Sequence, residues 1–191
     1  TFRELGELEK SETSYKLAIK YNPSYAEAYN NLGVTLRELC KLDDSEKAYK
    51  KAIELKNNYP DPYNNLSFTL LLKNQFEEAY KFSEWRWQTK YNIGKKFITS
   101  KPLWNGENNK TILVWKEQGI GDEIMYNSIL PELNAISKKL IVHCDKRLIP
   151  LFRRSFSNDI IFESNKENIS NNDFDYHIPI GSMPRFFRKD L

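Results

Sequence analysis

The first ninety residues repeat with a period of 34. Residues 29–32 (YNNL) return at 63–66 (YNNL), and Leu8 and Leu42 are separated by the same interval. A fixed period of this length marks a supersecondary unit that cannot bury its apolar face alone, so neighbouring units must stack. The period therefore predicts an α-solenoid of stacked helix pairs over residues 1–88.

Five helices are predicted within these repeats. Apolar residues recur at helical spacing, and Pro23, Pro60 and Pro62 lie near helix starts, where a missing N–H does no harm. The first repeat contributes only its second helix, so about two and a half repeats are expected, close to the roughly three that a stable stack needs. The predicted helices cover residues 9–21, 25–39, 43–56, 61–73 and 76–88.

Each repeat carries a short signature. Tyr29, Leu32 and Gly33 stand together in a first helix, and Ala52 closes the second helix that follows. This signature, at this period, resembles the tetratricopeptide repeat, and the resemblance implies a surface that binds proteins. Three positions depart from the motif, which predicts that the last repeat is a terminal one that packs on something else. They are Asn57, Ser67 and Arg86.

Two asparagines are the candidate peptide-binding residues. Asn31 and Asn65 lie one period apart on the same face of two first helices, so we expect them to stand one above the other. An amide side chain both donates and accepts hydrogen bonds, which suits an extended peptide backbone of any sequence. The pair resembles the asparagine ladder of O-linked N-acetylglucosamine transferase. The alternative interpretation is two ordinary polar residues on a solvated face.

The remaining sequence predicts a connector followed by a second domain. Gly94, Pro102 and Gly106 interrupt any regular pattern within residues 89–110, which we therefore interpret as the connector. Strand and helix patterns alternate over residues 111–191, and this alternation predicts a parallel sheet with right-handed crossovers. The predicted strands are 111–116, 139–144, 158–162 and 174–179, and the predicted helices are 122–137 and 146–154.

The turn at 117–123 (EQGIGDE) is the candidate ligand site of the second domain. It follows a predicted strand, and open α/β sheets bind ligands at the carboxyl ends of their strands. Gly119 and Gly121 would let the backbone approach a ligand closely, as in a dinucleotide site with Asp145 on the ribose, although the third glycine of that fingerprint is missing. Asp122 is either a helix cap or a reactive carboxylate that acts as a general base.

Five short motifs follow one another in the second half. They are EQGIGD at 117–122, LPEL at 130–133, CD with RLIPLF over 144–152, FDY at 174–176 and GSMPR at 181–185. Motifs of this kind, in this order after helical repeats, resemble those of bacterial tetratricopeptide-repeat proteins fused to a glycosyltransferase-like domain. That family is related to the heptosyltransferases and, more distantly, to O-linked N-acetylglucosamine transferase.

The resemblance implies a fold and a set of roles. Residues 111–191 would be the first Rossmann-like half of an incomplete GT-B fold, and Asp122 would be the catalytic base. The other half would hold a nucleotide-sugar donor, so this piece is expected to bind no cofactor and to be inactive by itself. The competing hypothesis is a non-catalytic protein-interaction module. The implied substrate contacts are Gln118, Gly119, Gly121, Gly181 and Ser182.

Composition narrows the remaining function classes. The 29 basic and 26 acidic residues leave a net charge of +3, which is too balanced for a nucleic-acid-binding surface. Cys40 and Cys144 lie in different halves and two histidines are present, so neither a disulfide framework nor a metal site is expected. No apolar segment has the length of a membrane span, and we expect a cytoplasmic protein. The chain begins with Thr1 inside a repeat, so we expect a fragment.

Overall fold

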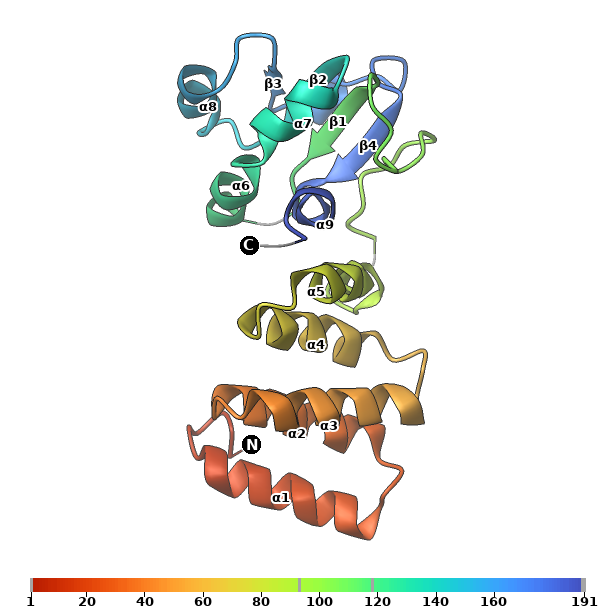
Figure 1. The fold of residues 1–191 in the computed structure, drawn as a ribbon, viewed down its shortest axis with the longest axis vertical. Helices are drawn as coiled ribbons and strands as arrows, with labels where there is room; N and C mark the ends of the chain where they lie inside the picture. Colours follow the sequence, from red (N-terminus) through yellow and green to blue (C-terminus); the bar gives the residue numbers. More distant parts are fainter. Residues whose placement is uncertain (1, 93, 118, 190–191) are drawn as a thin grey trace. The chain divides into compact units, whose positions relative to one another are not determined.

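The computed structural model describes residues 2–92, 94–117 and 119–189. These residues divide into two compact units, 2–92 and 94–189, and each unit is described by itself. In Figure 1, the first unit runs from red to yellow-green and the second from green to blue. The first unit is helical, and the second combines a parallel sheet with short helices.

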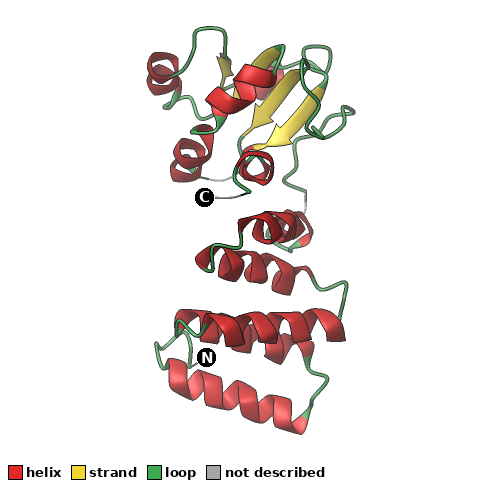
Figure 2. Ribbon diagram, viewed as in Figure 1, coloured by secondary structure: helices red, strands yellow, loops and turns green. Residues whose placement is uncertain are grey.

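The first unit consists of helices (Figure 2). These helices begin at the predicted period. Leu8, Leu42 and Phe76 begin α1, α3 and α5, and Ala26 and Pro60 begin α2 and α4, so equivalent helices start 34 residues apart. The predicted repeats are therefore confirmed at the level of their helices. The elements are α1 Leu8–Tyr21, α2 Ala26–Glu38, α3 Leu42–Leu55, α4 Pro60–Leu72, α5 Phe76–Ser83 and the 3-10 helix η1 Glu84–Gln88.

A close contact between Gly33 and Tyr49 holds the first complete helix pair together. The Tyr49 side chain is fully buried, and a Cβ at Gly33 would lie only 2.7 Å from its ring. Glycine is therefore required there because the ring of α3 occupies the place of a side chain on α2. Burial raises the pKa of the Tyr49 phenol to about 12. The ring also packs with Leu66 and Leu70 of α4, so it links two repeats.

Buried hydroxyl pairs recur with the same period between the helices. The Oγ of Ser11 lies 3.2 Å from Oγ1 of Thr35, and the Oγ of Ser45 lies 3.3 Å from Oγ1 of Thr69. Ser45 also donates to the carbonyl of Gly33 at 2.8 Å. Buried polar groups need partners, so these pairs fix how consecutive helices meet.

The last repeat ends differently from the prediction. A single helix was expected over 76–88, whereas α5 ends at Ser83 and η1 continues as a tighter 3-10 turn. Arg86 stands where the preceding repeat has Ala52, and its guanidinium donates to the Ser83 carbonyl at 3.1 Å. Trp85 stacks on Tyr63 of α4 with ring centroids 3.9 Å apart, which ties the 3-10 turn to its own repeat.

The second unit is built on a four-stranded parallel sheet. The strand order is β3-β2-β1-β4, and every neighbouring pair of strands is parallel. The predicted parallel sheet is confirmed, although β3 and β4 are shorter than expected. The strands are β1 Thr111–Trp115, β2 Lys139–His143, β3 Ile161–Glu163 and β4 Tyr176–Pro179.

One predicted helix of this unit is broken into two. The prediction of one helix over 122–137 is wrong, because α6 ends at Asn127 and α7 begins at Leu130. Pro131 explains the break, since its ring displaces the carbonyl four residues earlier and it has no N–H to donate. The remaining helices are α6 Ile120–Asn127, α7 Leu130–Ile136, α8 Ile149–Ser155, α9 Pro184–Phe187 and the 3-10 turns η2 Lys166–Asn168 and η3 Ile180–Ser182.

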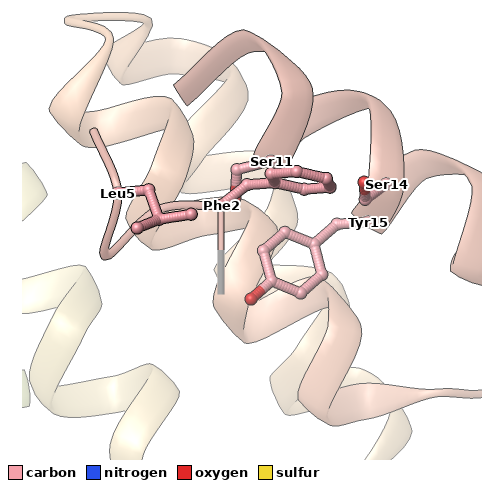
Figure 3. Close-up of a pocket in the computed structure, with 5 residues that line it drawn as sticks. All are labelled: Phe2, Leu5, Ser11, Ser14 and Tyr15. Carbon is pink, nitrogen blue, oxygen red and sulfur yellow. The ribbon is translucent and has the colours of Figure 1, made fainter. Parts of the chain in front are cut away.

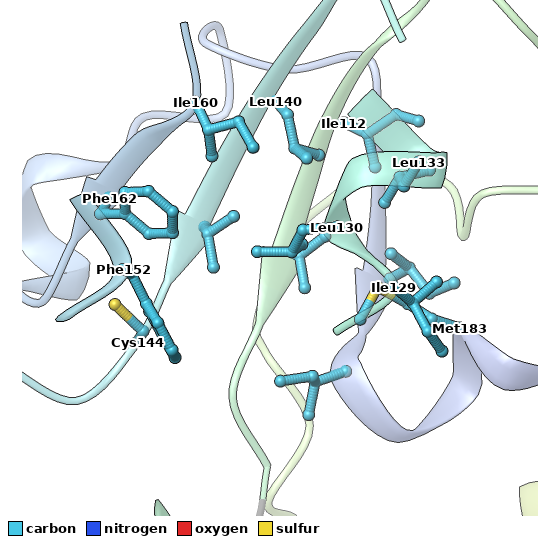
Figure 4. Close-up of a cluster of buried hydrophobic side chains, with 14 of the residues drawn as sticks. Ile112, Ile129, Leu130, Leu133, Leu140, Cys144, Phe152, Ile160, Phe162 and Met183 are labelled. Atoms are coloured by element: carbon cyan, nitrogen blue, oxygen red, sulfur yellow. The ribbon is translucent and has the colours of Figure 1, made fainter. Parts of the chain in front are cut away.

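Two of these helices cover one face of the sheet. Figure 4 shows Leu130 and Leu133 of α7 and Phe152 of α8 directed toward the strand side chains. The opposite face carries Trp115, whose indole N–H donates to Nδ1 of His177 at 2.9 Å. The ring of Phe97 packs against that indole with the ring centroids 6.0 Å apart, so part of the predicted connector belongs to the second unit.

Candidate functional sites

The first unit contains a polar pocket of about 340 Å³ on the exposed faces of its first helices. Both predicted peptide-binding residues, Asn31 of α2 and Asn65 of α4, line it, so the structure places them in one pocket. Most of the other lining residues were not predicted from the sequence. The signal that could have indicated some of them is the polar residues beside each asparagine. The further lining residues are Arg3, Asn30, Val34, Arg37, Glu38, Asp61, Asn64, Thr89, Tyr91 and Asn92.

Three amide side chains connect α2 to α4 in this pocket. Nδ2 of Asn65 donates to Oδ1 of Asn30 at 3.0 Å, and Nδ2 of Asn30 donates to Oδ1 of Asn31 at 3.5 Å. Asn31 is exposed, Asn65 is half-buried, and Asn30 is buried with 5% of its surface exposed. All three amides line the pocket, the two outer ones with more exposed surface than the middle one.

The charges around the amides are balanced. Arg3 and Glu38 form a partly exposed ion pair at 3.7 Å, and Asp61 lines the same pocket. Arg37 reaches from α2 to α4, where it donates to the carbonyl of Asn65 at 3.4 Å and lies 5.7 Å from the ring of Phe68. A pocket with both signs of charge and many amides suits a polar, uncharged group better than an anion or a cation.

An apolar pocket of about 450 Å³ lies beside α1 (Figure 3). Phe2, Leu5 and Tyr15 supply its apolar walls, and Ser11 and Ser14 complete it. Tyr15 is the counterpart of Tyr49, one period earlier, and Tyr49 is covered by Gly33 of α2. In the next repeat, the surface equivalent to this pocket is therefore covered by a first helix, α2.

The candidate turn of the second unit forms the start of α6. Gly119 is the cap of this helix, and its N–H donates to Oδ2 of Asp122 at 3.2 Å. Asp122 is half-buried and therefore remains accessible to solvent. A Cβ at Gly121 would meet no atom within 4 Å, so packing within the unit does not demand glycine there. Gln118 lies outside the described residues.

The loops after β1 and β4 meet at the same edge of the sheet. The backbone N–H of Gly181 donates to Oε1 of Glu117 at 2.6 Å, and Gly181 and Ser182 are both buried in η3. The strand order reverses between β1 and β4, and open α/β sheets bind ligands at such a switch point. In this structure, the predicted contact residue Gly181 already uses its N–H within the protein.

The other polar groups near this edge are engaged with one another. Oε2 of Glu123, which is buried, accepts from the N–H of Asp145 at 2.8 Å, and burial raises the pKa of that glutamate. Asp145 makes two hydrogen bonds to the Arg147 guanidinium, which hold its pKa well below the usual range. Asp145, the possible ribose-binding acid, is thus engaged by Arg147. Burial also raises the pKa of the Cys144 thiol to about 12.

The described residues contain no cluster of three or more His, Cys, Asp or Glu side chains that would hold a metal ion. None of the described helices combines the length and the apolar character that a bilayer crossing requires.

Comparison with known families identifies the repeats. A family model described as TPR repeat matches residues 1–39, and two models described as tetratricopeptide repeat match residues 26–59 and 48–81. Residues 1–81 thus carry tetratricopeptide repeats. The chain is 29% identical over 92 residues to Protein FlbA of Caulobacter vibrioides, an alignment that covers 46% of this chain. It spans only 15% of the length of that curated relative.

Solved structures of similar fold cover about half of the chain. The first TPR of Spaghetti (RPAP3) bound to an HSP90 peptide has a TM-score of 0.46 at 18% identity and covers 49% of this chain and 74% of that one. The TPR2B domain of yeast Sti1, in a pHsp70 complex, has a TM-score of 0.45 at 17% identity, covering 48% and 74%. MamA protein has a TM-score of 0.43 at 22% identity, covering 51% and 55%.

Proposed function

We propose that the repeat unit is a protein-interaction module that holds an extended polypeptide in the pocket formed by α2 and α4. The observation that carries this proposal is the amide-rich lining of that pocket, with Asn31 and Asn65 facing the same space. Stacked helical repeats bind partners on their extended surfaces. A peptide backbone offers N–H and carbonyl groups in alternation, and amide side chains satisfy both.

Two exposed apolar side chains of α4, the helix that carries Asn65, support a polypeptide as the occupant. Phe68 and Leu72 are one turn apart on α4, and they remain 48% and 60% exposed. Large apolar groups in such a position, next to polar groups that suit a backbone, fit the side chains of a bound peptide. The ligand class is therefore a peptide with an apolar residue, held chiefly through its backbone.

The test is binding of an array of short, blocked peptides to the complete chain. Asn31→Ala and Asn65→Ala are each expected to weaken the strongest binders about three- to tenfold, the value of a typical net hydrogen bond. Asn58→Ala removes an exposed amide outside the pocket and serves as the matched control. Undiminished binding in both pocket variants, or no binding by the unmodified chain, would refute the proposal.

A second candidate function is sugar transfer by the second unit. It is supported by the resemblance of the motifs to glycosyltransferase-like proteins and by the switch point between β1 and β4, where Asp122 lies on an accessible turn. In this proposal, residues 111–191 are a Rossmann-like half that shapes the acceptor side of a GT-B cleft. Asp122 removes a proton from the acceptor hydroxyl, and a nucleotide sugar is the donor.

The substitution Asp122→Asn separates this role from helix capping. Asparagine keeps an oxygen that accepts from the N–H of Gly119, so the helix start should be preserved. If Asp122 is the base, the variant loses nucleotide-sugar turnover in the full-length natural protein while its thermal stability is unchanged. Equal turnover in the variant and the unmodified protein would remove Asp122 from catalysis.

A further inference from the structure

We propose that buried Asn30 orients the two outer amides of the pocket, so that Asn31 presents a donor and Asn65 an acceptor to the bound peptide. This inference rests on the proposed function of the repeat unit and specifies how that site reads a backbone. The three side chains form a relay, from Asn65 through Asn30 to Asn31. Asn30 acts here as a positioning residue.

The relay uses one group of each outer amide. Nδ2 of Asn65 is engaged by Oδ1 of Asn30, and Oδ1 of Asn31 is engaged by Nδ2 of Asn30. The groups that remain wholly unused are Oδ1 of Asn65, an acceptor, and Nδ2 of Asn31, a donor, while Nδ2 of Asn65 keeps one further N–H and Oδ1 of Asn31 one further lone pair. Within the part of the chain that the structure describes, neither of the two unused atoms has a hydrogen-bond partner. A ligand N–H therefore faces Asn65, and a ligand carbonyl faces Asn31.

This arrangement differs from two independent asparagines. A free amide can rotate to donate or accept, and each asparagine would then bind the backbone in either sense. The relay restricts that freedom, because turning one outer amide alone would place two donors or two acceptors against each other, and the order reverses only if all three amides turn together. In the arrangement that the structure shows, the site thus favours a donor and an acceptor of the ligand in one order along the helix face.

The burial of Asn30 makes the inference testable. Asn30 lines the pocket with only 5% of its surface exposed, so it presents far less to the ligand than the outer amides do. A large effect of Asn30→Ala on affinity is therefore expected to pass chiefly through Asn31 and Asn65. Hydrogen bonds in such networks are coupled, so paired substitutions are the means to measure their interaction.

The experiment uses the strongest peptide of the array and a series of analogues in which one amide at a time is replaced by an ester. An ester has no N–H, so the analogue that loses the group facing Asn65 should bind about three- to tenfold more weakly. This loss should disappear in Asn65→Ala, persist in Asn31→Ala and shrink in Asn30→Ala. Hydrogen exchange of the helices verifies that each variant remains folded.

The outcomes separate this inference from the proposed function. If the peptide depends on Asn31 and Asn65 but Asn30→Ala changes neither affinity nor the ester profile, the relay is refuted and the peptide-binding function stands. An ester effect that disappears in Asn31→Ala instead of Asn65→Ala refutes the assigned polarity. If Asn30→Ala does not fold, the ester series with the two outer variants still decides the polarity. Absence of peptide binding refutes both.

Discussion

The two complete helix pairs of the repeat unit start in the same way and end differently. In the first pair, α2 and α3, Gly33 accommodates the ring of Tyr49. In the second pair, α4 and α5, the equivalent positions are Ser67 and Ser83, so position 83 brings no ring against α4. The second helix of the first pair has 14 residues, whereas α5 has 8 before the 3-10 turn begins.

This difference shows that the repeat period specifies where helices start, whereas side-chain contacts specify how long they are and how they pack. The period determines where helices begin, because the equivalent helices of the two pairs start 34 residues apart. The length and packing of each second helix depend on its own contacts. Ser67 is therefore not a defect of the motif, since the large partner that requires glycine in the first pair is missing from the second.

The largest effect is expected from removing the ring that distinguishes the first pair. Tyr49→Ala should lower the free energy of unfolding by about 3–5 kcal/mol, because it leaves a cavity between α2, α3 and α4. Urea unfolding followed by helical circular dichroism measures this change. Tyr49→Phe keeps the ring and is the control, and Ser83→Ala should cost less than about 1 kcal/mol. Equal costs at positions 49 and 83 would contradict the comparison.

A smaller loss is expected from a methyl group added to the first pair. Gly33→Ala places a Cβ 2.7 Å from the buried ring and should cost about 1–3 kcal/mol by overpacking. The same substitution in a Tyr49→Ser background, which imitates the second pair, should cost much less. A double-mutant cycle from urea midpoints gives the coupling. Additive effects of the two changes would show that the contact does not explain the glycine.

Loss of a buried hydroxyl should have a still smaller effect. Ser45→Ala removes the donor to the Gly33 carbonyl and the partner of Thr69, and should cost about 1–3 kcal/mol because both groups stay buried. Ser11→Ala deprives only Thr35 of its side-chain partner, so its cost should be lower. Thermal unfolding of the two variants tests this order, and the reverse order would contradict it.

The smallest effect is expected from equivalent ion pairs. Hydrogen bonds from Lys16 and Lys41 lower the pKa of Glu12, and for Glu46 those from Lys50 and Lys73 outweigh the opposing effect of burial. A lowered folded-state pKa stabilises the protein above the ordinary value of 4.5, and this contribution is lost as pH falls through the lowered value.

Glu12→Gln and Glu46→Gln should each cost less than about 1 kcal/mol at neutral pH, because the lysine partners other than Lys73 are about half exposed or more. The cost should vanish in acid, where the glutamates of the unmodified chain are protonated. Unfolding free energies measured across this range test the sign. A penalty that grows as pH falls would contradict the assigned pKa direction.

The repeats were predictable because their helices are specified by spacing alone. Leu8, Leu42 and Phe76 mark three helix starts, and the structure confirms them. The pocket was only partly predictable. Asn31 and Asn65 follow from the period, whereas the role of Asn30 depends on which way its side chain points between two helices, and a sequence pattern does not contain that information.

In the second unit, the alternation of strands and helices predicted the parallel sheet, but not the details at its edge. Pro131 stands at the break that separates α6 from α7, yet the apolar pattern continues across it and suggested one helix. The hydrogen bond between Glu117 and Gly181 joins loops 64 residues apart, so only the strand order brings them together. Asp122 lies on the predicted turn, and the structure adds its capping bond.

The most direct test of the interaction-module proposal is nuclear magnetic resonance of the side-chain amides during peptide titration. Single Asn→Ala variants assign the NH2 signals of Asn31 and Asn65, and the buried Asn127 of the second unit provides an internal reference. We predict that the signals of Asn31 and Asn65 shift together in proportion to bound peptide while that of Asn127 does not move. A peptide that binds without shifting either pocket signal would contradict the proposed site.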